Sequence, residues 1–179
     1  MSKLLVVIDM QNDFIDGTLG TGEAVQIVDK VVDKIKNYER NGDTIIFTKD
    51  THSDNYLDTQ EGKNLPVKHC IAKTNGWKIS SKICNITDIS KYKIYEKVTF
   101  GSSELAKDLM NGVYDTVSQI ELIGLCTDIC VISNALLIKT FLPEIPVAVD
   151  ASCCAGVTKE SHANALEAMK MCQINILNQ

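Results

Sequence analysis

The feature that most constrains the fold is an alternation of short apolar runs with longer segments of helical periodicity. Five runs with Leu, Ile or Val, together with the run 92–97 around Ile94 and Tyr95, predict strands at 3–9, 44–48, 92–97, 116–124, 146–149 and 173–177. Residues 22–40 carry apolar side chains at the spacing of one helix face, namely Val28, Val31, Val32 and Ile35. Further helices are predicted at 105–110, 127–140 and 158–171. This alternation predicts a three-layer α/β/α fold, Rossmann-like, with a six-stranded parallel sheet between two layers of helices.

The length and charge of the chain limit the classes of partner. We expect one domain over 1–179, because this length suits an ordinary single core. The net charge is −5 and no cluster of Lys and Arg occurs, which argues against binding to nucleic acid or to an anionic membrane. The apolar run at 4–8 ends at Asp9 and is too short for a signal peptide or a membrane span. The expected location is the cytoplasm.

The cysteines indicate free thiols in a reducing compartment. Their number, seven, is odd, and adjacent Cys153 and Cys154 do not fit a usual disulfide framework. No Cys-x-x-Cys pair occurs, which disfavours a zinc ribbon or a thioredoxin-type redox motif. A cysteine with a chemical role should therefore act singly.

Four polar positions follow the predicted strands. Asp9 ends the first strand, Asp50 follows the second, Lys97 ends the third, and the segment 124–130 follows the fourth. Ligands of parallel α/β sheets bind beyond the carboxyl ends of the strands. The sequence therefore predicts a site at this edge of the sheet.

Cys130 lies in the first turn of the predicted helix 127–140, which Thr127 and Asp128 are expected to cap. Unpaired N–H groups and the helix dipole at that point would lower the pKa of the thiol and favour a nucleophilic thiolate. A small buried apolar side chain explains the position equally well. Cys126, in the preceding turn, is expected to contribute its backbone more than its sulfur.

Asp9 and Lys97 each allow two interpretations. Asp9 is either a buried carboxylate of raised pKa that exchanges a proton, or a residue that caps the loop after its strand. Lys97 either points into the crevice, where its charge holds a thiolate, or is a solvated surface lysine.

The polar stretch 49–91 is too long for a simple connection and holds two of the three histidines. Asp50, His52 and His69 are metal-ligand residue types. By themselves they indicate a metal only weakly, because histidines are common in loops. His162, early in the last predicted helix, is expected to be a surface or capping residue without a catalytic role.

Six segments resemble the motifs of one family. They are 7–14 (VIDMQNDF), 49–52 (KDTH), 69–76 (HCIAKTNG), 97–103 (KVTFGSS), 124–131 (GLCTDICV) and 150–156 (DASCCAG). Together they are similar, nearly end to end, to the isochorismatase-like cysteine hydrolases, the superfamily that includes nicotinamidases. The last segment matches a family loop after the fifth strand.

The resemblance implies a catalytic triad of Asp9, Lys97 and Cys130 on the isochorismatase-like hydrolase fold. It also implies a cis peptide between Leu125 and Cys126. The backbone N–H groups of Cys126 and Cys130 would then form an oxyanion hole.

The resemblance to nicotinamidases further implies one divalent metal ion, zinc or else iron or manganese, held by Asp50, His52 and His69. Glu61 stands where some relatives have an additional ligand. The implied reaction converts nicotinamide to nicotinate and ammonia, a step of NAD salvage, with the metal binding the ring nitrogen. Phe14, and less directly Trp77, are candidates for packing against the substrate ring. Relatives are often dimers or tetramers, so a homo-oligomer is expected.

Two departures from the family pattern leave alternatives open. The stretch 65–68 lacks the aromatic residue often seen in nicotinamidase pockets, and Lys73 stands where glycine is usual. Another small amide is therefore an alternative substrate. A metal-binding domain without catalysis is a second alternative, and a redox protein that bridges Cys126 and Cys130 is a third.

Overall fold

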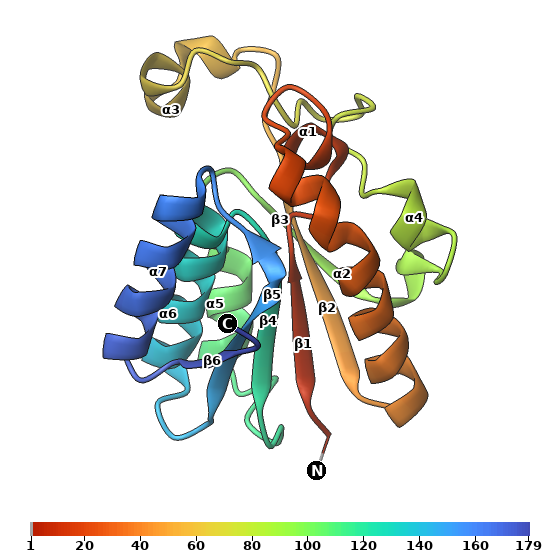
Figure 1. Cartoon of the computed structure of the whole chain (residues 1–179), viewed down its shortest axis with the longest axis vertical. Coiled ribbons are helices and arrows are strands. Elements are labelled where there is room, and N and C mark those ends of the chain that lie inside the picture. The colour runs from red at the N-terminus through yellow and green to blue at the C-terminus, as the bar shows by residue number, and fades with distance from the viewer. Residues whose placement is uncertain (1) are drawn as a thin grey trace.

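All six predicted strands are present and form one parallel sheet in the computed structural model, which describes residues 2–179 (Figure 1). They are β1 (Leu4–Ile8), β2 (Thr44–Asp50), β3 (Lys93–Lys97), β4 (Ile120–Leu125), β5 (Val147–Ala155) and β6 (Asn175–Leu177). Their order across the sheet is β3-β2-β1-β4-β5-β6. Every neighbouring pair is parallel, which confirms the predicted fold class.

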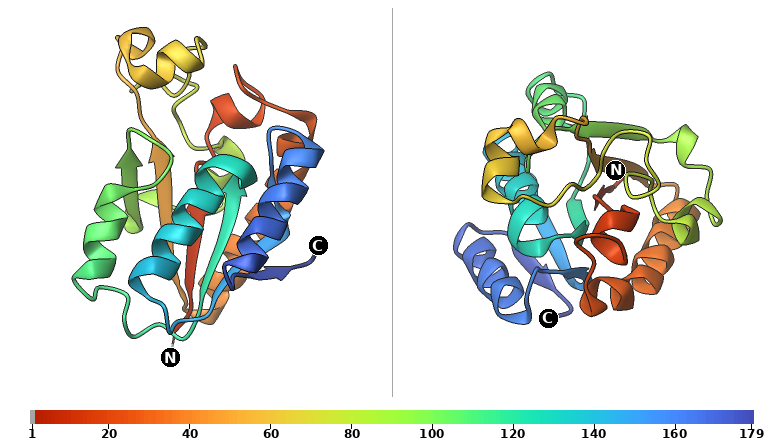
Figure 2. Two further views of the ribbon diagram at one scale, coloured as in Figure 1. Left: turned by 90° about the vertical axis from the view of Figure 1, so that its left-hand side faces the viewer. Right: turned by 90° about the horizontal axis from the view of Figure 1, so that it is seen from above.

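Helices cover both faces of the sheet. One face packs against α5 (Ser103–Met110), α6 (Ile132–Phe141) and α7 (Lys159–Met171), and the other against α2 (Gly22–Asn41) and the short α4 (Ser81–Cys84) (Figures 1 and 2). Each face has its own apolar cluster, which explains why the strands are apolar on both sides. No helix in the described part of the chain is long and apolar enough to cross a membrane.

Helix α2 forms as its sequence predicts. The Thr21 hydroxyl accepts a hydrogen bond from the Ala24 N–H at 3.0 Å, which caps the first turn. Gly42 ends the helix with φ of 69°, a left-handed conformation that glycine adopts without a steric penalty. The predicted apolar side chains all face the sheet.

The predicted helix 127–140 is not continuous. A π-helical turn, Thr127–Val131, precedes α6, and the N–H groups of Ile129 and Val131 both donate to the Cys126 carbonyl. Thr127 and Asp128 do not cap it, contrary to the prediction. Their side chains bind other segments: the Thr127 hydroxyl pairs with His162 Nδ1 at 2.8 Å, and the Asp128 carboxylate accepts the Val157 N–H.

Strand β5 is longer than predicted. It continues through residues 150–155, which were expected to form a loop. The polar residue in its middle, Asp150, is accommodated because Lys34 from α2 lies 2.7 Å from its carboxylate and Ser152 donates to it. The local sequence pattern therefore predicts that the strand ends before Asp150, but the partners of this carboxylate allow it to lie inside a strand between β4 and β6.

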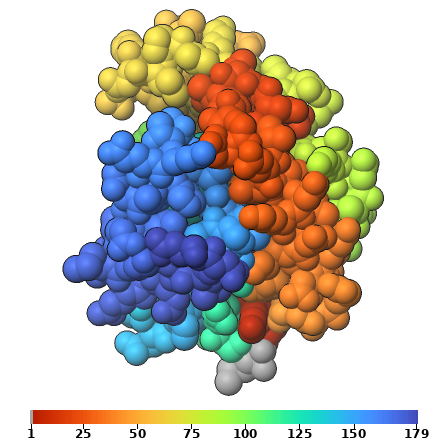
Figure 3. Space-filling model, in the orientation of Figure 1, coloured from red at the N-terminus to blue at the C-terminus, as the bar shows by residue number. Residues whose placement is uncertain are grey.

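The long polar stretch crosses the carboxyl edge of the sheet and contains short helices that the sequence did not predict. A 3-10 turn (Tyr56–Asp58) leads to α3 (Gln60–Asn64), which stands above the sheet in Figure 1. The space-filling view shows this part of the chain at the top of the molecule (Figure 3). The stretch therefore covers the edge at which the sequence predicts a site.

The centre of that edge lies between β1 and β4. The chain builds β2 and β3 on one side of β1 and then crosses to β4, β5 and β6 on the other. Such a switch point is where ligands bind in sheets of this kind. Gly124, at the end of β4, has φ of 119°, and a Cβ there would lie 2.1 Å from the Ile8 carbonyl oxygen. Only glycine allows the two strand ends to approach this closely.

Candidate active site

The side chains of Asp9, Lys97 and Cys130 meet at this switch point. Asp9 follows β1, Lys97 ends β3, and Cys130 lies in the π-helical turn after β4. The Lys97 ammonium Nζ is 2.7 Å from Asp9 Oδ2 and 3.4 Å from Cys130 Sγ. All three residues are buried. The structure thus joins the three residues that the resemblance groups as a triad.

The Asp9 carboxylate does not cap its loop. Its Oδ1 accepts a hydrogen bond from the Thr48 hydroxyl at 2.7 Å, and its Oδ2 faces Lys97. The backbone of Asp9 has φ of 45°, which is uncommon outside glycine and costs about 1–3 kcal/mol. Strained backbone of this kind clusters at functional sites. The peptide bond between Leu125 and Cys126, at the end of the neighbouring strand β4, is cis, as the resemblance implies.

Burial strongly affects the pKa values of Asp9, Lys97 and Cys130. It raises the pKa of Asp9, and the Lys97 charge offsets only part of this effect. Burial, followed by the Asp9 charge, raises the pKa of the Cys130 thiol well above its usual value. Burial disfavours the Lys97 cation, but the charges of Asp9, Cys130 and Asp50 outweigh burial and raise the pKa of Lys97. The predicted lowering of the Cys130 pKa is therefore wrong, because desolvation exceeds the effect of the helix terminus.

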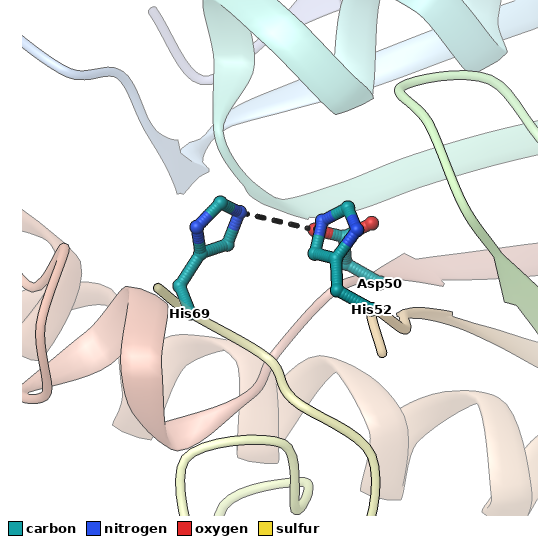
Figure 4. Close-up of side chains that lie close together, drawn as sticks. All are labelled: Asp50, His52 and His69. Carbon is teal, nitrogen blue, oxygen red and sulfur yellow. Dashed lines mark hydrogen bonds and ion pairs between the residues drawn. The ribbon is translucent and has the colours of Figure 1, made fainter. Parts of the chain in front are cut away.

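Asp50, His52 and His69 converge beside this group (Figure 4). One potential ligand atom from each lies within 4.8 Å of the others. Asp50 Oδ2 is 3.0 Å from His52 Nε2 and 3.5 Å from His69 Nε2. His69 Nδ1 donates to the Val67 carbonyl at 2.8 Å, which leaves Nε2 to face the cluster.

This donor set fits a divalent metal. One carboxylate oxygen and two imidazole nitrogens suit zinc, and also iron or manganese. Three protein ligands leave coordination positions open, as in catalytic rather than structural sites. Glu61 Oε1 lies 3.8 Å from the Nε2 atoms of both His52 and His69, so its carboxylate borders the same position.

Asp50 connects the candidate metal ligands to Lys97 and, through it, to Asp9 and Cys130. Its Oδ1 is 3.4 Å from Lys97 Nζ, so one ammonium faces both carboxylates. Burial opposes its ionisation, but the two imidazoles and Lys97 hold the pKa of Asp50 below its ordinary value. Gln11, to which the sequence pattern assigns no role, fixes the backbone of Asp50. Its side chain donates to the Asp50 carbonyl at 2.8 Å and accepts the Asp50 N–H at 2.7 Å.

A cavity of 210 Å³ opens above Cys130. Its walls are mostly apolar and include Phe14, Leu19, Leu65, Phe100, Leu125, Ile129 and Val157. Asp50, Glu61 and His69 line it on the side of the metal-ligand cluster. The cavity therefore brings together an apolar surface, a thiol and the candidate metal ligands.

The two aromatic candidates differ in position. Phe14 lines the cavity, and its ring centroid is 5.6 Å from that of His69. Trp77 does not line the cavity. Its indole N–H donates to the Thr51 hydroxyl at 2.8 Å, and its ring lies 2.9 Å from the Lys49 ammonium. Trp77 therefore packs within the long stretch, against Lys49 and Thr51, rather than against the cavity.

The remaining candidates lie as follows. Cys126 lines the cavity beside Cys130, and both are free thiols. His162 is half-buried and pairs with Thr127, so it is not at the cavity. Lys73 has φ of 69°, a left-handed conformation that explains why glycine is common at its position in the family.

Comparisons with known proteins agree with this arrangement. The family model described as "Isochorismatase domain" matches residues 3–178. The chain is 28% identical to an "Uncharacterized isochorismatase family protein PncA" of Bacillus subtilis, over 93% of each chain. It is 21% identical to a nicotinamidase of Schizosaccharomyces pombe, over 98% of this chain and 92% of the relative. A solved pyrazinamidase of Pyrococcus horikoshii in complex with zinc superposes with a TM-score of 0.83, at 27% identity and full coverage of both chains. The motifs, the sheet and the family match together show that this chain belongs to the isochorismatase family of hydrolases.

Proposed function

We propose that this protein is a nicotinamidase-type cysteine amidohydrolase, which converts nicotinamide to nicotinate and ammonia through a thioester on Cys130. The observation that carries the proposal is the position of Lys97, whose buried ammonium contacts Asp9 and also Cys130 and Asp50, two residues that line the cavity. The names of two relatives, a nicotinamidase and a zinc-bound pyrazinamidase, support a small aromatic amide as the substrate.

The first half of the reaction forms the thioester. Asp9 accepts the proton of the Cys130 thiol as the sulfur attacks the amide carbonyl carbon. The Lys97 cation stabilises the sulfur as its negative charge develops, and the N–H groups of Cys126 and Cys130 hold the oxyanion. The C–N bond then breaks, and Asp9 returns its proton to the leaving nitrogen, which departs as ammonia.

The second half releases the acid. Asp9, again ionised, accepts a proton from a water molecule while the oxygen of that water attacks the thioester carbon. The C–S bond breaks, and the proton passes from Asp9 to the sulfur, which restores the thiol. The raised pKa values of Asp9 and Cys130 suit this exchange, because both groups hold a proton more readily than they do in water.

The cavity walls orient the substrate. Phe14, Leu65 and Phe100 form an apolar surface for a flat ring, and Cys130 lies at its base. Asp50, His52 and His69, with Glu61 beside them, would hold a divalent metal ion, which when bound supplies a positive charge that orients and polarises the amide.

A second candidate function is hydrolysis of another small amide. Leu65 lines the cavity on the stretch where nicotinamidases often have an aromatic residue, and it narrows the pocket less than a ring would. Ammonia release measured from nicotinamide, pyrazinamide and aliphatic amides tests both candidates. The highest kcat/KM is expected for nicotinamide, and a preference for an aliphatic amide would favour the second candidate.

Removal of the metal is expected to lower activity without unfolding the protein. The ligands lie above the sheet edge, while the apolar clusters on the two sheet faces hold the fold. We expect chelation to lower kcat/KM by about 100-fold or more, since a bound cation supplies several kcal/mol to the reaction. Circular dichroism should stay unchanged, and added zinc should restore turnover. Full activity in protein shown to be metal-free would contradict the proposed site.

The pH profile should show the raised pKa of Asp9. Burial raises this pKa above the 3.8 of a free side chain. Below it Asp9 is protonated and cannot accept the thiol proton, so kcat/KM is expected to fall as the pH falls. The measurement is kcat/KM from about pH 4 to about pH 8 with the metal content checked at each point. An acid limb with an apparent pKa below 3.8 would show that Asp9 is not the base.

A further inference from the structure

Tyr56 packs against both histidines of the candidate metal site. Its side chain is fully buried. Its ring centroid is 4.7 Å from that of His52 and 4.9 Å from that of His69. The two imidazole centroids are 4.9 Å apart, so the three rings form one compact group with tilted and edge-on contacts.

The His52 ring has no second hydrogen bond to a protein group in the described part of the chain. Metal-bound histidines usually donate their second ring nitrogen to a carboxylate, a backbone carbonyl or water, as His69 Nδ1 does to the Val67 carbonyl. Within residues 2–179, the His52 ring makes its one hydrogen bond through Nε2, to Asp50. Nε2 is also the atom that faces the metal position. Once it binds a metal, the His52 ring is held on the protein side by ring packing, against Tyr56 on one side and against His69, which Tyr56 also contacts.

The Tyr56 hydroxyl makes a second connection. It donates to the Leu65 carbonyl at 3.0 Å, just past the end of α3. The Tyr56 carbonyl accepts the Thr59 hydroxyl, and a Cβ at Gly62 would lie 2.1 Å from that same carbonyl oxygen. The 3-10 turn and α3 are thus closed tightly around Tyr56. Leu65, whose backbone it holds, forms part of the cavity wall.

We propose that Tyr56 is a positioning residue with two separable effects: its ring orients His52 and His69 for a divalent metal, and its hydroxyl sets the Leu65 wall of the substrate cavity. The effect of the ring concerns metal affinity and does not depend on which amide is hydrolysed. The effect of the hydroxyl rests on the proposed amidohydrolase function. The two effects therefore need separate measurements.

The effect of the ring is tested by zinc affinity, measured by competition with a chromophoric chelator at neutral pH. Tyr56→Leu removes the ring, and we expect zinc to bind about 10- to 100-fold more weakly. Tyr56→Phe keeps the ring, and its zinc affinity should stay within about twofold of wild type. Wild-type affinity in Tyr56→Leu would overturn the proposal. If that variant does not fold, Tyr56→Met fills the space without a flat ring, and we expect the same loss of zinc affinity. Wild-type zinc affinity in Tyr56→Met would also overturn the proposal.

The effect of the hydroxyl is tested by kinetics of zinc-loaded Tyr56→Phe. Loss of one hydrogen bond to the cavity wall is expected to raise KM for the amide about fivefold and to leave kcat unchanged. An unchanged KM would refute this part of the proposal. If wild-type protein hydrolyses no amide, the proposed function fails, while the zinc titration still decides the effect of the ring.

Tyr38→Leu is the matched control. Tyr38 is also buried, and its hydroxyl also makes one hydrogen bond, to Glu121, near the end of α2 that is remote from the cavity. It should lower thermal stability and leave zinc affinity unchanged. Equal weakening of zinc binding by Tyr38→Leu and Tyr56→Leu would show a general effect of lost stability and would overturn the positioning role.

Discussion

Cys130→Ala is expected to lower ammonia release from nicotinamide by about 10,000-fold or more. The thiol lies at the cavity base, 3.4 Å from the Lys97 ammonium, and no thioester forms without its sulfur. The alanine variant should fold normally, because Cys130 is a small buried residue on the edge of an apolar cluster. A coupled ammonia assay at high enzyme concentration measures the loss.

Cys172→Ala controls for the loss of a thiol as such. Cys172 is exposed at the C-terminal end of α7, whereas the cavity residues Gly156 and Val157 precede the N-terminal end of that helix, so its replacement should leave turnover unchanged. Both variants should retain bound metal and the wild-type circular dichroism spectrum. Turnover by Cys130→Ala within tenfold of wild type would exclude Cys130 as the nucleophile.

Lys97→Met is expected to reduce both stability and activity. The substitution leaves the Asp9 and Asp50 carboxylates buried without their shared cation, which costs about 3–5 kcal/mol of unfolding free energy. Loss of the cation beside the sulfur should lower kcat/KM by at least about 100-fold. Urea unfolding in the presence of a chelator measures the first effect, and steady-state kinetics of the metal-loaded protein measure the second.

The stability loss of this variant should depend on pH. Without Lys97, burial acts unopposed and the folded-state pKa of Asp9 rises further above its unfolded value. The ionised carboxylate then destabilises the fold most at neutral pH, and the loss shrinks as the pH falls and Asp9 becomes protonated. A loss that grows on acidification would contradict the assignment of the cost to Asp9.

Lys34→Met is the matched control for Lys97→Met. Lys34 Nζ is 2.7 Å from both Glu121 and Asp150, two carboxylates that are nearly buried. Its loss should destabilise the fold in the same way, because it also leaves two carboxylates without their cation. Activity per folded molecule should stay at the wild-type level, since this cluster lies away from the cavity. If Lys97→Met behaves identically, Lys97 has only a structural role.

The sequence by itself determined the sheet, the main helices and the edge that carries the site. Strand and helix periodicity are local properties, and a parallel sheet with both faces covered follows from their alternation. The position of Asp9, Lys97 and Cys130 at one edge followed from strand ends alone, and the structure places their side chains in contact. The family resemblance added the metal ligands, which the structure brings within 4.8 Å of one another.

The tertiary structure alone decided which side chains touch and how burial changes their chemistry. Gln11 hydrogen-bonds to the backbone of Asp50, 39 residues away in the chain. Tyr56 packs against His52 and His69 inside the folded long stretch. Local patterns predict neither such contacts nor the place of Trp77. The pKa of the Cys130 thiol also depends on desolvation and on a carboxylate from another strand, which is why its predicted direction was wrong. Periodicity is encoded residue by residue, whereas burial and charge pairing exist only once the strands have assembled.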